Sequence, residues 1–231
     1  GVKFLHDTNG NAMIPIEELT ADDVVMIPAF GTTLELEKVI QDKGIEIQKY
    51  NTTCPFVEKV WNRSDQIAKK GYSVVIHGKP KHEETRATFS HAAANTPTLI
   101  VNDMEETIVL GDYILGKMSM DAFKEYFAGR YSIGFDPILD LLKIGVVNQT
   151  TQLATDTQAI SDYLKQIIIK KYATSISYTS TSYYLYRQHD SQTYGGINNY
   201  SDDLIRFRAK RLIKYIDVLL TKRTHLYDDF K

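Results

Sequence analysis

The chain has 231 residues, of which 43% are hydrophobic, enough for one large domain or two small ones with packed cores. Its formal net charge of −2 gives no electrostatic reason to expect nucleic acid or an anionic membrane as the main partner. No apolar run approaches the roughly 20 residues of a membrane span, and residues 1–11 lack the layout of a signal peptide. The single cysteine, Cys54, can form no internal disulfide and no cysteine-only metal site within one chain, which favours a reducing, cytoplasmic compartment.

Apolar, strand-like runs alternate with segments of helical periodicity over most of the chain. We expect strands over 1–6, 22–31, 45–51, 72–78, 96–103 and 143–149. We expect helices over 33–44, 54–71, 82–92, 104–117 and 155–172, and an irregular helical insertion over 119–140. This alternation predicts an α/β fold of repeated βαβ units with mainly parallel sheets.

The composition changes near Tyr172. Residues 173–203 are rich in Ser, Thr and Tyr, and a basic segment with helical, amphipathic periodicity follows over 204–223. We therefore expect a boundary at residue 172, and a second, less marked one near Cys54.

Four of the expected strand-to-helix junctions are unusually polar: 29–35, 51–56, 77–85 and 147–152. In open α/β sheets, ligands bind beyond the carboxyl ends of the strands. Helix N-termini at this edge offer free N–H groups and a positive dipole end, which favour anions. Each threonine there is also compatible with an ordinary helix N-cap. Together the junctions predict a shared site for a phosphorylated or otherwise anionic ligand.

The junction 77–85, HGKPKHEET, is the richest of the four. It gathers two histidines, two lysines and two glutamates, His82 and Glu84 among them. A carboxyl group close to a basic cluster and a helix start can donate or relay a proton, and Lys and His can hold a phosphate. A solvated loop with a capping glutamate is the alternative interpretation.

Cys54 stands at the start of the helix expected over 54–71, directly before Pro55. A helix N-terminus stabilises the thiolate, which is the form that binds metal or attacks an electrophile. A buried, inert cysteine is the alternative. The sequence contains no Cys-x-x-Cys or His-x-x-Cys pair that would support a zinc site.

Three segments together resemble the 4-hydroxy-3-methylbut-2-enyl diphosphate reductase family, also called IspH or LytB. TTCPFVEKVW is similar to the family's A-T-C-P-x-V-x-K-V-H segment. GYSVVIHGKPKHEETRATFSHA is similar to its G-x-x-H-x-E-x-x-G stretch, and GVVNQTTQLATDT to its Q-T-T-L-S segment. The order and the intervals agree from about residue 1 to residue 172.

The resemblance implies an iron–sulfur oxidoreductase of the bacterial cytoplasm. Its activity would be the reductive dehydration of 4-hydroxy-3-methylbut-2-enyl diphosphate to isopentenyl and dimethylallyl diphosphate, in the methylerythritol phosphate route to isoprenoids. The implied cofactor is a 4Fe-4S cluster, and the implied electron donor is ferredoxin or flavodoxin. The family's three α/β domains would correspond to a partial first domain over 1–53, a complete second domain over 54–172, and a divergent remnant of the third over 173–231, ending in a basic helix.

The resemblance also implies roles for individual residues. Cys54 matches the middle of three cysteines that hold the cluster, as a thiolate ligand of iron. Glu84 matches the acid that delivers protons to the substrate hydroxyl, and Thr150 the threonine that helps to position this hydroxyl. The remaining residues implied in substrate binding are His82 on the diphosphate, Gln149, Thr151, Thr32 and Thr33.

The sequence departs from the family pattern at the other ligands. Phe30 stands where the family has a diphosphate-binding histidine, and Leu185 falls about where the third cysteine belongs. The first cysteine lies in an N-terminal segment that is absent here. One thiolate cannot hold a cluster that needs three, so we expect this chain by itself to be inactive.

A truncated or frame-shifted copy of a reductase is the interpretation we favour. A fragment whose relatives are active and a non-catalytic diphosphate-binding module are the alternatives. An unrelated phosphosugar-binding α/β domain would require all three segment matches to be coincidence.

Overall fold

The computed structural model describes residues 2–7 and 10–172. The expected third-domain remnant, the basic segment 204–223 and Leu185 lie outside the described residues. The described residues fall within one compact unit, Gly1–Ile176. The domain boundaries expected at residues 53 and 172 stay predictions.

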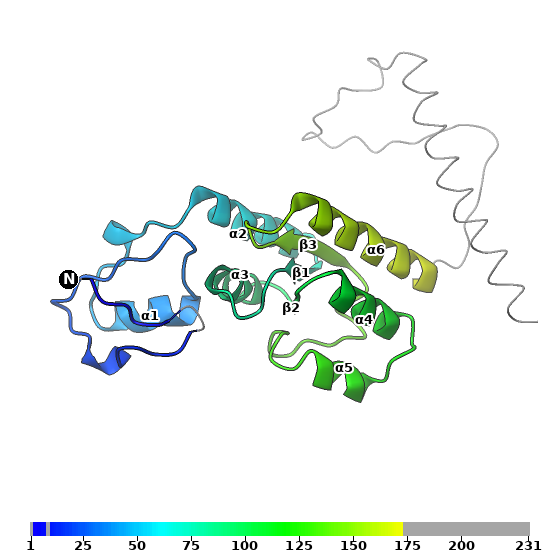
Figure 1. Ribbon diagram of the computed structural model, residues 1–231, viewed down its shortest axis with the longest axis horizontal. Helices are drawn as coiled ribbons and strands as arrows, with labels where there is room; N and C mark the ends of the chain where they lie inside the picture. Colours follow the sequence, from blue (N-terminus) through cyan, green and yellow to red (C-terminus); the bar gives the residue numbers. More distant parts are fainter. Residues whose placement is uncertain (1, 8–9, 173–231) are drawn as a thin grey trace, which may run out of the picture. The chain divides into compact units, whose positions relative to one another are not determined.

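Helices and strands alternate from residue 55 onward, except that two helices follow one another over residues 104–126 (Figure 1). The helices are α1 (Leu34–Asp42), α2 (Pro55–Ala68), α3 (Glu83–Ala93), α4 (Met104–Ile114), α5 (Met120–Tyr126) and α6 (Ala154–Tyr172). The strands are β1 (Ser73–His77), β2 (Thr98–Val101) and β3 (Ile144–Asn148). Two short 3₁₀ turns, η1 (Ile16–Glu18) and η2 (Gln48–Tyr50), were not expected from the sequence.

The three strands form one parallel sheet in the order β2-β1-β3, which confirms the expected α/β class. Val101, His77 and Asn148 are level with one another, so all three strands end at the same edge. The expected helices and strands after residue 53 are all present, and the irregular insertion is helical only over Met120–Tyr126.

Helices cover both faces of this sheet. Val75 and Leu99 point to the face packed by α4, α5 and α6. Val74 and Ile76 point to the other face, where Ile67 of α2 and Ala92 of α3 meet them. Because both faces are buried, β1 reads as a continuous apolar run instead of an alternating one.

The strands expected over 1–6, 22–31 and 45–51 are wrong for the described residues. Segments 22–31 and 45–51 meet at one isolated parallel bridge, Ile27–Asn51, and His6 forms one antiparallel bridge with Ala12. Pro28 has no N–H to extend the ladder, and the facing segment turns away in η2. The apolar side chains of these segments and of α1 nevertheless form one buried cluster: Val25, Ile27, Ile40, Ile45 and Ile47.

Candidate functional site

The junctions after β1 and β3 lie side by side at the carboxyl edge of the sheet. Their strands are neighbours, and the N–H of Gln149 donates to the carbonyl of His77 at 2.9 Å, one residue beyond the end of β3. The sheet order therefore brings 77–85 and 147–152 together, although residues 86–146 lie between them in the chain.

Glu84 and Thr150 are joined directly. Glu84 is 3% exposed and lies in the first turn of α3. The hydroxyl of Thr150 donates to its Oε2 at 2.8 Å, and the N–H of Thr150 donates to its Oε1. A buried carboxyl needs such partners. Thr150 itself is exposed, so its hydroxyl connects the buried acid to the surface.

Gln149 is held by protein groups on both sides of its amide. It is 2% exposed. Its Oε1 accepts hydrogen bonds from the N–H of Lys79 at 3.1 Å and from the hydroxyl of Thr85 at 3.0 Å. Its Nε2 donates to Oγ1 of Thr151 at 2.5 Å. The polar atoms of Gln149 are thus engaged within the protein, and its role in substrate binding stays a prediction.

His82 is the N-cap residue of α3. Its Nδ1 accepts from the N–H of Glu84 at 3.2 Å, and its side chain is half-buried. An imidazole that accepts at Nδ1 carries its proton on Nε2, which can then donate to an anion. His82 and the start of α3 therefore present donors next to Glu84.

The two N-terminal junctions form a second pair. The N–H of Cys54 donates to the carbonyl of Ala29 at 2.8 Å. Thr33 is the N-cap of α1, where its Oγ1 accepts from Leu36 at 3.3 Å, as the alternative interpretation of these threonines expected. Thr32 precedes it and is half-buried. In the part of the chain that the structure describes, no hydrogen bond joins this pair to Glu84 or Thr150, and the shared anion site stays a prediction.

Cys54 occupies the N-cap position of α2 with Pro55 after it, as expected. Its side chain makes no capping hydrogen bond, and the residue is half-buried. Within residues 2–7 and 10–172, no group of three His, Cys, Asp or Glu side chains could hold a metal ion. The sequence supplies one thiolate, so the residues present do not by themselves fit a cluster that needs three.

His77 does not join the polar cluster that its sequence neighbours suggested. It is 2% exposed, and its Nδ1 lies 2.8 Å from Oγ1 of Thr157 in α6. Burial lowers the pKa of His77, and the negative charges of Asp156 and Asp103 oppose this only in part. A neutral histidine here links the end of β1 to α6.

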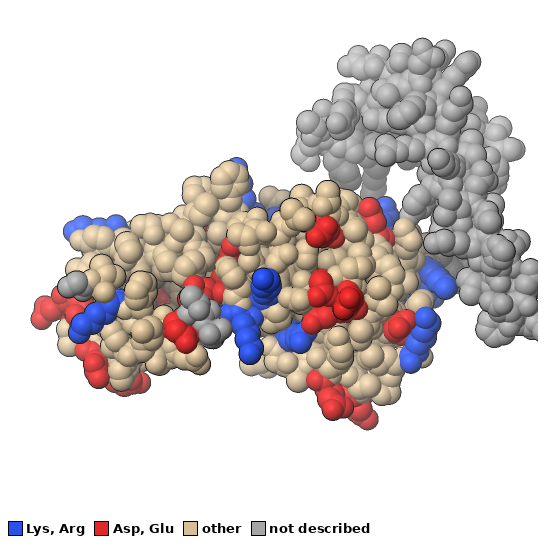
Figure 2. Space-filling model, in the orientation of Figure 1, with Lys and Arg blue, Asp and Glu red and all other residues tan. Residues whose placement is uncertain are grey.

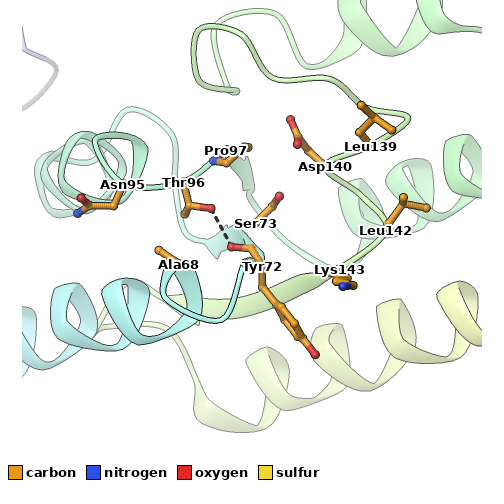
Figure 3. A pocket seen from close by; sticks show the side chains of 11 residues that line it. Ala68, Tyr72, Ser73, Asn95, Thr96, Pro97, Leu139, Asp140, Leu142 and Lys143 are labelled. Carbon is orange, nitrogen blue, oxygen red and sulfur yellow. Dashed lines mark hydrogen bonds between the residues drawn. The ribbon is translucent and has the colours of Figure 1, made fainter.

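A surface cavity of about 420 Å³ lies at the opposite, amino-terminal edge of the sheet (Figure 3). Tyr72, Asn95, Asp140 and Lys143 contribute to its wall, and the hydroxyl of Thr96 donates to the carbonyl of Tyr72 at 2.8 Å. The lining includes no residue of the predicted site.

On the face of the molecule in Figure 2, basic side chains are interspersed with acidic ones. No helix in the described ranges is long and apolar enough to cross a membrane.

Sequence reasoning did not single out Thr85 or Gly78. A side chain on Gly78 would meet Thr85, because a Cβ there would lie 2.6 Å from Oγ1 of Thr85. A glycine directly after a strand was the available signal, since such positions mark a close approach of other groups.

The chain is therefore a parallel α/β protein with a buried, threonine-linked carboxyl group at the carboxyl edge of its sheet. The LytB protein family matches residues 1–181, and the chain belongs to this family. The match ends beyond Tyr172, inside the segment where the composition changes.

Two curated relatives carry the name 4-hydroxy-3-methylbut-2-enyl diphosphate reductase. The protein of Synechococcus sp. (strain RCC307) is 43% identical over 185 residues, covering 74% of this chain and 44% of the relative. The protein of Synechococcus sp. (strain CC9902) is 43% identical over 166 residues, covering 69% and 40%. A solved structure of (E)-4-hydroxy-3-methyl-but-2-enyl diphosphate reductase is similar with a TM-score of 0.48 and 23% identity, over 69% of this chain and 46% of that one. The chain spans less than half the length of the curated relatives it matches.

Proposed function

We propose that this chain carries the substrate-binding and proton-delivering part of a 4-hydroxy-3-methylbut-2-enyl diphosphate reductase. Membership of the LytB family supports the reaction. The observation that carries the proposal is the Glu84–Thr150 pair, a buried acid bonded to an exposed hydroxyl at the sheet edge where α/β proteins bind ligands.

The proposed overall reaction is a two-electron reduction. The substrate's C–O bond breaks, the hydroxyl leaves as water with one proton, and a second proton forms a C–H bond, giving isopentenyl or dimethylallyl diphosphate. A 4Fe-4S cluster, for which Cys54 would be one of three thiolate ligands, would supply these electrons after receiving them from a ferredoxin or flavodoxin. Because these 231 residues supply one of the three thiolates, the reaction is proposed for a protein that holds all three.

The chain's own contribution is to move a proton. In its acid form Glu84 donates to Oγ1 of Thr150, and the Thr150 hydroxyl donates in turn to the leaving hydroxyl of the substrate. A hydroxyl can accept and donate at once, and the 2.8 Å separation of Oγ1 and Oε2 suits such a relay. The short path lets an acid that is 3% exposed act on a group at the surface.

The diphosphate would bind beside this pair. Nε2 of His82 would supply a donor for its oxygens, and the positive dipole end of α3 favours an anion there. Thr32 and Thr33 are proposed to hold its far end in place of the histidine that Phe30 replaces, and Gln149 and Thr151 line the same edge.

Calorimetry with 4-hydroxy-3-methylbut-2-enyl diphosphate tests the binding part on the 231-residue chain. We expect binding that His82→Asn weakens about tenfold, the cost of one charge-assisted hydrogen bond, whereas His6→Asn in the N-terminal loop leaves it unchanged. No heat of binding to the folded protein would contradict the proposal.

Reconstitution tests the catalytic part. After anaerobic treatment with iron and sulfide we expect no stable cluster on the present chain, and four irons per chain would overturn this. A chain completed with the other two cysteines should develop cluster absorbance near 400 nm (roughly, a general property of such clusters) and reduce the substrate. Glu84→Gln should then abolish turnover while the cluster remains. A completed chain that stays colourless would remove the catalytic proposal.

A non-catalytic diphosphate-binding module is the second candidate, supported by the single cysteine. It predicts diphosphate binding by the present chain together with an inactive completed chain. For either function we propose the bacterial cytoplasm, because one unpaired cysteine suits a reducing compartment.

A further inference from the structure

Two neighbouring hydrogen-bonded rungs connect α3 to the segment that follows β3. The first is Glu84–Thr150, at 2.8 Å between Oε2 and Oγ1. The second is Thr85–Gln149, at 3.0 Å between Oγ1 and Oε1. Glu84 is next to Thr85 in the chain, and Gln149 is next to Thr150. A shift of one hydrogen-bonded pair must therefore move the other.

The backbone N–H of Lys79 determines the orientation of the Gln149 side-chain amide. A backbone N–H can only donate, so the atom of Gln149 that lies 3.1 Å from the N–H of Lys79 is the oxygen. The amide nitrogen then faces Thr151, to which it donates. One buried side chain therefore binds the loop after β1, the first turns of α3 and the loop after β3.

The packing around this rung leaves little freedom. Thr85 is 0% exposed and Gln149 is 2% exposed. Both contact the space above Gly78, where a Cβ would lie 2.6 Å from Oγ1 of Thr85 and 3.0 Å from Cβ of Gln149. Thr85 and Gln149 are thus held against backbone, and the rung they form is fixed in position.

We propose that Thr85 and Gln149 are positioning residues that hold Glu84 and Thr150 in register for proton delivery. This inference rests on the proposed function for its consequence and on the two rungs for its geometry. In this role Gln149 acts through its neighbours, because its amide is buried and its oxygen accepts two hydrogen bonds from the protein. The Thr85 methyl packs, and its hydroxyl does the positioning.

The test compares two buried threonines of the same helix. Thr85→Val removes the bond to Gln149, whereas Thr88→Val removes a bond of the same kind, in which Thr88 accepts from Trp61 at 3.1 Å. The readout is the hydrogen exchange of the Thr150 amide, which donates to Glu84, followed by NMR relative to the amides of Val75 and Ile100 in the sheet.

We expect Thr85→Val to speed exchange of the Thr150 amide roughly tenfold more than exchange of the sheet amides, as loss of one buried hydrogen bond permits. Thr85→Ser should restore slow exchange, and Thr88→Val should change all these amides alike. Equal acceleration of Thr150 and the sheet amides in Thr85→Val would overturn the proposal, because the role would then be stability alone.

A second pair of variants tests the proposal if Thr85→Val does not fold. Thr151→Val removes the partner of the Gln149 nitrogen, and Thr155→Val alters another exposed threonine of the same region. We expect severalfold faster exchange of the Thr150 amide in Thr151→Val only, and equal rates in both variants would overturn the proposal. Exchange needs neither substrate nor cluster, so these outcomes are separate from those that decide the proposed function.

Discussion

The regions on either side of Cys54 are stabilised in different ways. The sheet region, residues 54–172, has three strands in parallel register with helices on both faces. The N-terminal region, residues 2–7 and 10–53, has one apolar cluster beneath loops that meet at isolated bridges. In the sheet region, hydrogen bonds between strands and side-chain packing stabilise the fold together. In the N-terminal region, side-chain packing contributes more than hydrogen bonds between strands.

Residues 24–27 show how the N-terminal region differs from the sheet region. Val25 and Ile27 are buried, whereas Val24 and Met26 are 68% and 56% exposed. The backbone therefore alternates as a strand does, but only one side is covered within the described residues. In β1 of the sheet region both sides are covered, and the same kind of apolar run becomes a strand. The run covered on both sides thus forms a ladder, whereas the run covered on one side, which is followed by Pro28, forms a single bridge.

The largest expected effect is that of Phe123→Ala in the sheet region. Phe123 is 0% exposed, and its ring centroid lies 4.5 Å from that of Tyr113 and 5.0 Å from that of Phe127. We expect a loss of about 3–5 kcal/mol in the free energy of unfolding, measured by urea titration. Tyr126→Ala, an exposed aromatic of the same helix, is the control and should cost far less. Similar losses in both variants would contradict the central place of Phe123.

A somewhat smaller and more local effect is expected from Ile40→Ala in the N-terminal region. Ile40 is 1% exposed within the apolar cluster. We expect a loss of about 2–3 kcal/mol, seen by NMR as lost amide protection over 25–53 while β1, β2 and β3 keep theirs. Val39→Ala changes the exposed neighbour and should leave both regions intact. If the sheet lost protection to the same extent, the two regions would unfold as one unit.

The contact between the regions provides the third comparison. The hydroxyl of Ser90 in α3 donates to Oε2 of Glu35 at 2.7 Å and accepts from the N–H of Leu34 at 2.9 Å. This bond is the main reason that the pKa of Glu35 lies below its usual value. We expect Ser90→Ala to cost about 1 kcal/mol and to move the pKa of Glu35 back upward, as followed by carboxyl ¹³C NMR.

Ser64→Ala is the matched control for this contact. Ser64 is also buried, but its hydroxyl donates to the carbonyl of Val60 within α2. It should leave the titration of Glu35 and the protection of 34–42 unchanged. A Glu35 titration that is identical in Ser90→Ala and the parent chain would show that the bond does not join the regions in solution.

The sequence was sufficient to predict the sheet region, because runs such as Val74–Ile76 are apolar throughout and are separated by helices with clear caps. The polar junctions indicated the segments 77–85 and 147–152, and the family resemblance singled out Glu84 and Thr150 within them, whose roles stay predictions. It did not predict the Thr85–Gln149 contact. That contact depends on β1 and β3 being neighbours in register, a pairing across more than 60 residues that no local pattern encodes.

Acidification should produce the smallest effect, through two histidines of the sheet region, the buried His77 and the half-buried His91. Burial lowers the pKa of His77 at the end of β1, and also that of His91, whose ring stacks on Trp61 at a centroid distance of 3.7 Å. Charges that oppose this shift, such as Asp156 for His77 and Asp65 for His91, act less strongly than burial. Burial therefore disfavours the protonated form of both imidazoles in the folded chain.

The sign of the effect follows from proton binding. With a folded pKa below the unfolded one, the unfolded chain takes up a proton first as the pH falls through about 6.5. The free energy of unfolding should therefore decrease from pH 7 to about pH 5.5, above the range in which most carboxylates titrate. Glu37, whose pKa burial raises, acts in the opposite sense and is present in every variant.

Single replacements show which part of the chain is responsible for the pH dependence of stability. His77→Gln should flatten the pH dependence of amide exchange in β1 and β3, because its ring contacts Thr157 within the sheet region. His91→Gln should flatten it over 34–42, because α3 meets α1 through the turn that carries His91 and Ser90. His6→Gln should change neither slope. A stability that rises on acidification in the parent chain would mean that these rings are protonated when folded, which their burial opposes.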